Sequence, residues 1–556
     1  MKRIFSVLTI FAVLIMLFAC ETQNVQGNGE VSDSNENDSD SSSISKAVTV
    51  AVPTFSLNGA SKGVYITKAA TSTKITGPSG SVIHYTLDGT NPTTSSTKKT
   101  VTTNTVTISL TATGGKNGKG GYQIKAASYL SGTYSAVVEE RYVIGNSTTI
   151  PAINKSDVML QGFNWMTSVP STKWYVTLKN NATEIKNFNW VWLPPPSDAG
   201  DLQGYMPRQL FNFANNYGTL AQHQDAINAI KGGTNNTKLI ADIVINHRVG
   251  DTTVFDSFKN PVWDKNQIVP QNSWGGSGSG WNDTGAQFSA ARDIDHTDPL
   301  VQKDVLDFLS KLKTLGYSGW RYDYVKGYSG QFNGYYNALS SAEFSVGELW
   351  QDGAPQNGLD EWVNATSTGG AKSMIFDFAL KNDLNKVFGW YDATKNVGGT
   401  NNLSQLKRSD TTKQTGYVGW KPENCITFVD NHDTGGEQKH WALEGSKIYL
   451  AYVYTLTQSG LPCVFWDHYF NWNDTTNTNR IGNGKNMQNH IKELIKIRRA
   501  AGVTNTSAVT TQTVSSNLYS AKVGDKLYMK IGSGSWSPSG SGWTIYSGND
   551  FAVWYK

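Results

Sequence analysis

Eight short runs of apolar residues recur between residues 158 and 466, separated by stretches with helical spacing. Nearly continuous apolar runs are typical of strands that are buried on both faces of a parallel sheet. The alternation of such strands with helices predicts a parallel α/β architecture. We predict strands at Val158–Phe163, Trp190–Leu193, Leu239–Ile245, Ser318–Asp323, Phe344–Glu348, Met374–Phe378, Ile426–Asp430 and Cys463–Trp466.

The clearest helix of the chain begins after Asp298 and ends before Gly316. Asp298 is suited to an N-cap, Pro299 to the first helical position, and Gly316 to the residue that follows the helix. Its apolar stripe consists of Val301, Val305, Phe308, Leu309 and Leu312. This spacing predicts an amphipathic helix with one face against a core.

Several predicted strands end in charged or ring side chains. The stretch GYSGWRYDYVKG presents Arg321 and Asp323, and the runs IADIVINH, FSVGELW and ITFVDNHD end in a similar way. Polar groups at the ends of separate strands are typical of the catalytic mouth of a (β/α)8 barrel. An Arg beside an Asp favours the ionised carboxylate, so we expect Asp323 to carry a charge.

These motifs resemble a known family. DIVINH, GWRYDYVKG, GELW and FVDNHD are similar, in order, to the four signature regions of the α-amylase family of glycoside hydrolases. QGFNW, WLPPP, QGYMP, WDHYFNW and SGNDFAVWYK resemble the plant-type α-amylases, over about residues 158–556. The resemblance implies retaining endo-hydrolysis of internal α-1,4-glucosidic bonds in starch, glycogen and related α-glucans.

The chemistry of glycoside cleavage needs a carboxylic acid and a carboxylate. Asp323 fits the nucleophile, and Glu348, between apolar neighbours that would raise its pKa, fits the acid/base. The resemblance implies that Asp433 is a third catalytic carboxylate, which binds sugar hydroxyls. The resemblance also implies six substrate-binding residues: Tyr205, His247, Arg321, Lys326, Trp350 and His432. A His-His-carboxylate metal centre is the competing interpretation, disfavoured because no H-E-x-x-H spacing is present.

The resemblance further implies one shared calcium site. Its ligands would be Asn246, Asp283 and Asp293 with the carbonyl groups of Ala286 and Gly327. Oxygen atoms of this kind are what Ca²⁺, a hard cation, prefers. In the family this calcium joins the barrel to a small subdomain inserted after the third strand, here residues 248–297.

The front of the chain has the pattern of an exported bacterial protein. Lys2 and Arg3 precede an apolar run at 4–18, too short to span a membrane and typical of a signal peptide. The run ends at a sequence resembling a lipobox, so we expect a signal peptide at 1–19, a lipid on Cys20, and attachment to the cell envelope; ordinary cleavage and secretion is the alternative. Residues 20–47 are polar and acidic and predict a disordered tether.

Short alternating runs at 48–146, punctuated by Gly, Pro and Asn, predict an antiparallel β-sandwich. The stretch YTLDGTNPTTSS resembles immunoglobulin-like modules found beside chitobiase-type enzymes. We expect this sandwich to act as a spacer or weak glycan-binding module without a catalytic group. The catalytic barrel would occupy 155–500, and a C-terminal antiparallel β-domain 501–556.

Composition adds few constraints. A net charge of +4 without a basic stripe makes nucleic acid an unsuitable partner. Cys425 and Cys463 fall on runs predicted to be neighbouring barrel strands, which favours buried free thiols over a disulfide. We expect a monomer. Two other functions remain open: a malto-oligosaccharide-forming or transglycosylating relative, and a non-catalytic surface protein that binds glycans.

Overall fold

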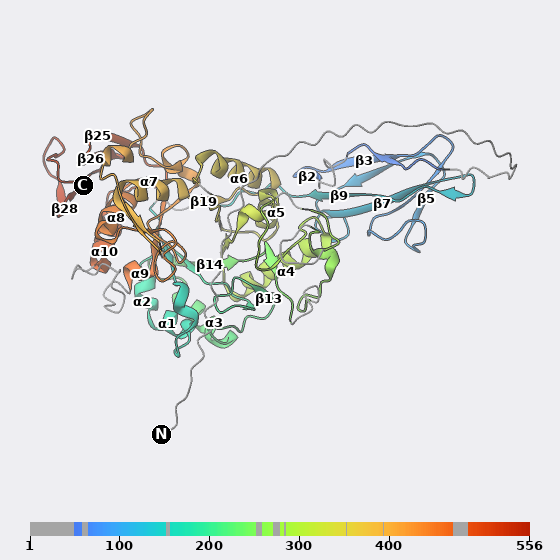
Figure 1. Ribbon diagram of the computed structural model, residues 1–556, viewed down its shortest axis with the longest axis horizontal. Coiled ribbons are helices and arrows are strands. Elements are labelled where there is room, and N and C mark those ends of the chain that lie inside the picture. Colours follow the sequence, from blue (N-terminus) through green and yellow to red (C-terminus); the bar gives the residue numbers. More distant parts are fainter. Residues whose placement is uncertain are drawn as a thin grey trace, which may run out of the picture. The chain divides into compact units, whose positions relative to one another are not determined.

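The computed structural model describes residues 49–57, 65–151, 156–251, 258–270, 278–282, 285–351, 353–392, 394–470 and 487–556 (Figure 1). Cys20, the tether and Asp283 lie outside the described residues. Residues 49–556 form one compact unit. Among the helices described, none has both the length and the apolar content that crossing a membrane requires.

A closed barrel of eight strands forms the centre of the chain, and each strand runs parallel to its two neighbours. The predicted (β/α)8 barrel is therefore confirmed. In order around the barrel the strands are β10 (Met159–Gln161), β11 (Trp190–Leu193), β14 (Lys238–Ile243), β17 (Gly319–Tyr322), β18 (Phe344–Gly347), β19 (Met374–Phe376), β22 (Cys425–Phe428) and β24 (Leu461–Phe465). Several strands end one or two residues before the predicted end; beyond β17 and β18 the next residues are Asp323 and Glu348, which belong to the loops at the barrel mouth.

The helices between the strands cover the barrel. They are α1 (Trp174–Asn180), α2 (Ala182–Ile185), α3 (Leu220–Ile230), α4 (Pro299–Leu315), α5 (Gly330–Leu339), α6 (Gln356–Gly369), α7 (Phe378–Phe388), α8 (Ile448–Thr457), α9 (Trp466–Tyr469) and α10 (Met487–Ala500). Helix α4 has the predicted ends. The Asp298 side chain accepts a hydrogen bond from Leu300 N at 2.7 Å, and Gly316 takes a φ of 123°, which a residue with a side chain rarely adopts.

The N-terminal region contains two sheets that share a separate apolar core. One sheet consists of β1 (Thr54–Phe55), β3 (Thr71–Thr76) and β6 (Thr105–Leu110). The other consists of β2 (Tyr65–Thr67), β9 (Val138–Ile144), β7 (Gly121–Leu130), β4 (Val82–Thr86) and β5 (Lys99–Val101), with β8 (Thr133–Tyr134) beside β7. Ile75, Leu110, Ile124 and Tyr142 are among the buried residues between them. One expectation was wrong in part, since β2 pairs with β9 in parallel rather than antiparallel.

The inserted segment after β14 returns to the barrel through a short hairpin-like pair. Strand β15 (His247–Arg248) lies antiparallel to β16 (Arg292–Asp293), and His247 pairs with Asp293. A short 3-10 helix, Lys265–Gln267, lies within this segment. Two smaller sheets are formed by segments between the barrel strands. One consists of β12 (Asp198–Ala199) and β13 (Pro207–Gln209), and the other of β20 (Gly389–Tyr391), β21 (Asn396–Gly398) and β23 (Ala442–Leu443).

The C-terminal region is a five-stranded antiparallel sheet, as predicted. Its order is β25 (Val509–Ser515), β26 (Leu518–Val523), β27 (Leu527–Ile531), β29 (Phe551–Tyr555) and β28 (Thr544–Gly548). Its inner face joins the same apolar core as the barrel. Cys425 and Cys463, on β22 and β24, are both buried and free, which confirms the thiol prediction.

Candidate active site

Arg321 is the fully buried centre of the candidate site. It leaves β17, and its Nη1 donates to Asp242 Oδ1 and to Asp323 Oδ1, both at 2.7 Å. Its Nη2 lies 2.8 Å from Glu348 Oε2. Because β17 and β18 are neighbouring parallel strands, the residues that follow them meet at one edge of the barrel. One guanidinium therefore holds the two predicted catalytic carboxyl groups side by side.

Burial and mutual contact set the proton affinities of this pair. Burial raises the pKa of Asp323 to about 6; Arg321 opposes the rise and the charge of Asp242 adds to it. The expectation that Arg321 alone keeps Asp323 ionised is therefore incomplete, because burial outweighs it. Burial also raises the pKa of Glu348, and the hydrogen bond between the two side chains raises the pKa of Glu348 while lowering that of Asp323. This mutual hydrogen bond favours the protonated form of Glu348, which suits the acid/base role.

Asp433 and His432 follow β22 on the same side of the barrel. His432 Nε2 lies 3.2 Å from Asp433 Oδ2, and its Nδ1 lies 2.9 Å from Gln161 Nε2. Burial lowers the pKa of His432, so its ring is neutral. Burial, followed by the charge of Glu348, raises the pKa of Asp433. Asp433 keeps 22% of its side-chain surface exposed, so one face of this carboxyl group points toward solvent.

Aromatic rings surround the carboxyl groups. Tyr205 stacks on His432 at 5.2 Å between ring centroids and on Trp165 at 6.0 Å. The Tyr205 hydroxyl donates to Asp242 Oδ2 at 2.8 Å, which fixes the ring. The Trp192 ring lies 4.8 Å from the Arg321 guanidinium carbon. The Tyr205 ring is partly exposed, and a ring of this kind offers an apolar face for a sugar.

The other predicted substrate contacts lie nearby with protein partners. His247 Nε2 donates to Tyr205 O at 2.7 Å, and its ring stacks on Phe288 at 3.8 Å. Burial lowers its pKa to about 4, so His247 is neutral. Lys326 Nζ donates to Trp350 O at 3.1 Å. Each residue thus lies near the predicted site, and their sugar contacts stay predictions.

Asp242 is a further residue of the candidate site, and the sequence motifs did not predict its role. It lies inside β14, its carboxyl is fully buried, and it accepts hydrogen bonds from Arg321, Tyr205 and Trp192 Nε1. Burial raises its pKa to about 6. The signal in the sequence was a single carboxylate inside the apolar run IADIVI, where an unpaired charge would be costly.

Four of the five predicted calcium ligands lie among the described residues, and they are close together. Asn246 Oδ1 is buried and has no hydrogen-bond partner among the described residues, while Asn246 Nδ2 donates to Asp293 Oδ1 at 3.3 Å. A Cβ on Gly327 would lie 1.8 Å from Asn246 Oδ1, and Ala286 N donates to Lys326 O. Within the described part of the chain, no three His, Cys, Asp or Glu residues form a metal-binding group. The orphaned amide oxygen, one carboxylate and nearby carbonyls fit a hard cation.

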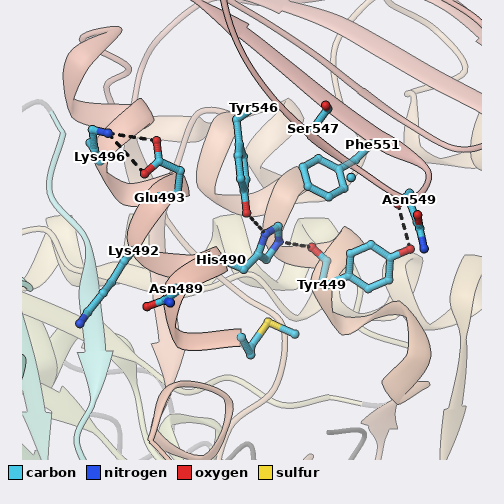
Figure 2. Close-up of a pocket in the computed structure, with 12 residues that line it drawn as sticks. Tyr449, Asn489, His490, Lys492, Glu493, Lys496, Tyr546, Ser547, Asn549 and Phe551 are labelled. Carbon is cyan, nitrogen blue, oxygen red and sulfur yellow. Dashed lines mark hydrogen bonds and ion pairs between the residues drawn. The ribbon is translucent and has the colours of Figure 1, made fainter. Parts of the chain in front are cut away.

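A separate cavity of about 790 Å³ lies away from these residues, between α8, α10 and the strands β28 and β29 (Figure 2). His490 lies at its centre, between the Tyr546 hydroxyl at 2.8 Å and Tyr449 O at 3.0 Å. None of the predicted site residues lines this cavity. The cavity is therefore separate from the predicted site.

A closed parallel barrel that presents two paired carboxyl groups at neighbouring strand ends has the arrangement of a barrel glycoside hydrolase. A family model described as the alpha-amylase C-terminal beta-sheet domain matches residues 500–555. "Probable alpha-amylase 2" of Arabidopsis thaliana is 34% identical over 425 residues, which is 72% of this chain and 94% of that protein. The chain therefore belongs to the α-amylase family, and it is a glycoside hydrolase that acts on α-glucans.

Two further comparisons agree with this assignment. A glucan 1,4-alpha-maltotetraohydrolase of Stutzerimonas stutzeri is 30% identical over 388 residues, 64% of this chain and 63% of that protein. The crystal structure of an alpha-amylase from H. orenii has a TM-score of 0.51 at 15% identity, and it covers 72% of this chain and 97% of that chain. The second likeness concerns the fold alone.

Proposed function

We propose that this enzyme cleaves internal α-1,4 bonds of starch, glycogen and related α-glucans with retention of configuration. The observation that carries the proposal is the contact of one guanidinium, Arg321, with both Asp323 and Glu348. Their mutual hydrogen bond moves their proton affinities in opposite directions. One ionised and one protonated carboxyl group are what a double displacement at the anomeric carbon needs.

In this mechanism Glu348 donates its proton to the leaving glycosidic oxygen while Asp323 attacks the anomeric carbon. The bond between the anomeric carbon and the leaving oxygen breaks, and a covalent glycosyl-enzyme forms. Glu348 then takes a proton from water, and that water releases the sugar from Asp323. Asp433 and the neutral His432 hold sugar hydroxyls, and the Tyr205 ring supports the sugar face.

The test is the anomer released at early times from soluble starch, followed by proton NMR before mutarotation. We expect the α-anomer, with no release by the Glu348→Gln variant. Early release of the β-anomer would contradict the double displacement. Absence of starch cleavage by the folded wild-type protein would contradict the proposed function itself.

A second candidate, formation of one preferred malto-oligosaccharide, is supported by the similarity to the Stutzerimonas enzyme, whose name describes such a reaction. The same residues would serve it, because water and sugar acceptors compete for one glycosyl-enzyme. Chromatography of the products from soluble starch separates the two: a broad distribution of early products supports endo-hydrolysis, and a single dominant oligosaccharide supports the second candidate.

Calcium would be held by the oxygens of Asn246, Asp293, Ala286 and Gly327, with Asp283 as the remaining predicted ligand. When bound, the ion supplies a cross-link between the inserted segment and the loop after β17. Asn246 directly precedes His247 in the chain. The calcium ligands would therefore also help to hold the His247 ring in place. The orphaned Asn246 Oδ1 supports this ligand set.

The cellular location of the protein is also part of the proposal. The lipobox-like sequence before Cys20 supports export and a lipid anchor, with residues 20–47 as a tether and the enzyme acting as a monomer outside the cytoplasm. A single acyl chain binds a membrane only marginally, so firm attachment requires more than one chain on Cys20.

A further inference from the structure

The N-terminal sandwich contacts the catalytic region through a buried cation. Arg141 of β9 keeps only 6% of its side-chain surface exposed, and its Nη1 donates to Asp295 Oδ2 at 2.8 Å and to Thr297 Oγ1 at 2.7 Å. Its guanidinium carbon lies 4.4 Å from the centroid of the Trp281 ring. Glu139, on the same strand, accepts from Arg141 Nε at 2.8 Å. A spacer would not need contacts of this kind.

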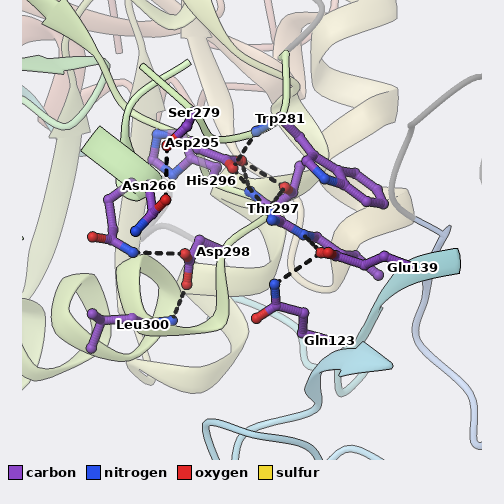
Figure 3. Close-up of polar contacts among 12 residues, drawn as sticks. Gln123, Glu139, Asn266, Ser279, Trp281, Asp295, His296, Thr297, Asp298 and Leu300 are labelled. Atoms are coloured by element: carbon purple, nitrogen blue, oxygen red, sulfur yellow. Dashed lines mark hydrogen bonds and ion pairs between the residues drawn. The ribbon is translucent and has the colours of Figure 1, made fainter. Parts of the chain in front are cut away.

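Asp295 is fully buried, and both of its carboxylate oxygens are used (Figure 3). Oδ2 also accepts from Trp281 N at 2.7 Å, and Oδ1 accepts from the backbone and the hydroxyl of Thr297 at 2.9 and 2.6 Å. Arg141 is the cation that forms an ion pair with this carboxylate among the described residues. Removing the cation would leave a buried charge without its partner, which is strongly unfavourable.

A second contact reaches the same segment from another loop of the sandwich. Asn117 Nδ2 donates to Gln302 Oε1 at 3.0 Å, and Gln302 Nε2 donates to His296 O at 3.0 Å. The Tyr335 hydroxyl of α5 donates to Lys119 O at 2.7 Å. The packing here is tight, because a Cβ on Gly121 would lie 2.2 Å from Gln302 Oε1. Two independent contacts therefore converge on residues 295–297.

The segment that the sandwich holds lies directly beside the end of β14. Ile294 N donates to Asn246 O at 2.9 Å, and His296 Nε2 donates to Ile245 O at 2.9 Å. One residue earlier, Asp293 pairs with His247 between β16 and β15. Contacts at residues 293, 294 and 296 thus fix the backbone from Ile245 to His247.

We propose that the sandwich is a docked part of the catalytic unit, and that Arg141 is a positioning residue that holds His247 in place through the segment Asp293–Thr297. This inference rests on the proposed function, because it concerns the placement of a substrate-binding ring. It adds to that function a dependence of cleavage on a residue outside the barrel. The sandwich still contributes no catalytic residue.

The test is a double-mutant cycle on kcat/KM for a short soluble malto-oligosaccharide, measured well below the melting temperature of each variant. We expect Arg141→Ala to lower kcat/KM by about tenfold. The kcat/KM of Arg141→Lys should lie between those of Arg141→Ala and the wild type. In a His247→Asn background, Arg141→Ala should cause less than a twofold further change, because it acts through that ring. Lys125→Ala is the matched control: Lys125 pairs with Glu139 on the sandwich at 3.3 Å, and we expect activity within twofold of wild type.

Two results would overturn the inference. One is a folded Arg141→Ala protein with kcat/KM within twofold of wild type; the other is a tenfold loss that persists unchanged in the His247→Asn background, which would indicate a structural role only. If Arg141→Ala is insoluble, the Arg141→Lys variant carries the same cycle. Failure of the proposed function gives a different result, because the wild-type protein would then cleave no α-glucan. The contact between the sandwich and the barrel could still be tested in that case: Arg141→Lys and Asp295→Asn should lower the melting temperature non-additively.

Discussion

The charge of Asp242 adds to the burial that raises the pKa of Asp323, the proposed nucleophile, and Asp242→Asn tests this contribution. Asp242 and Asp323 both accept from Arg321 Nη1 at 2.7 Å, so their oxygens lie within about 5 Å of each other; two unit charges at that distance repel by about 3 kcal/mol at an effective dielectric constant of ~20. At 1.36 kcal/mol per pKa unit this repulsion corresponds to about two units. Because Arg321 cancels part of it, we expect the pKa of Asp323 to fall by about one unit.

The sign of the effect follows from the role of Asp323. The nucleophile must be ionised, so activity is lost as the pH falls through its pKa, which burial places at about 6. A lower pKa keeps Asp323 ionised at lower pH, and the acidic limb of the kcat/KM profile of Asp242→Asn should move about one unit toward acid. The assay is the initial rate of reducing-end release from a soluble malto-oligosaccharide between about pH 4 and 8, a range that brackets the pKa of Asp323.

Asp304→Asn is the matched control for this prediction. Asp304 is a buried carboxylate that accepts from Trp263 Nε1 at 2.8 Å, as Asp242 accepts from Trp192, but it lies on α4. Its replacement should leave the acidic limb in place. An unchanged limb in Asp242→Asn, or one displaced toward higher pH, would refute the idea that Asp242 raises the pKa of the nucleophile.

Three other outcomes are expected. Asp323→Asn and Glu348→Gln should each lower kcat by several orders of magnitude with melting temperatures close to wild type, because each removes a chemical role; substantial turnover of purified Asp323→Asn would contradict the assignment. Calcium chelation should lower the melting temperature by about 5 °C or more, since a bound ion stabilises the native state by mass action, and Asp293→Ala should remove that difference; equal melting temperatures with chelator and with calcium would refute the site. Cys20→Ser should move the protein from the membrane to the soluble fraction, and retention on membranes would contradict a lipid at that residue.

The sequence predicted the barrel well because its signals are local. Each barrel strand is a short apolar run with clear ends, and α4 carries its stripe and both caps, so their positions were found within about two residues. The proximity of Asp323 and Glu348 could be predicted because parallel strands bring their ends to one edge of the barrel. Strand β3, TSTKIT, has a weaker local signal, because its Thr and Ser residues give little contrast between faces.

What the sequence did not predict depends on contacts between distant residues. Arg141 and Asp295 are 154 residues apart, and neither has a local pattern that names its partner. The parallel pairing of β2 with β9 likewise depends on how two sheets close around a core. Asp242 had a local signal, but its partner Arg321 became evident only when β14 and β17 lay side by side.

The balance of charge around Arg321 has a consequence for inhibition. A single guanidinium, that of Arg321, faces the carboxyl groups of Asp242, Asp323 and Glu348, and the charges of these groups raise its pKa. With Glu348 protonated, two carboxylates still outnumber the one cation. A sugar mimic with a protonated amine at the scissile position would supply the missing positive charge. Such a compound should bind more tightly than its neutral oxygen analogue, and this preference should weaken as acid neutralises the carboxylates.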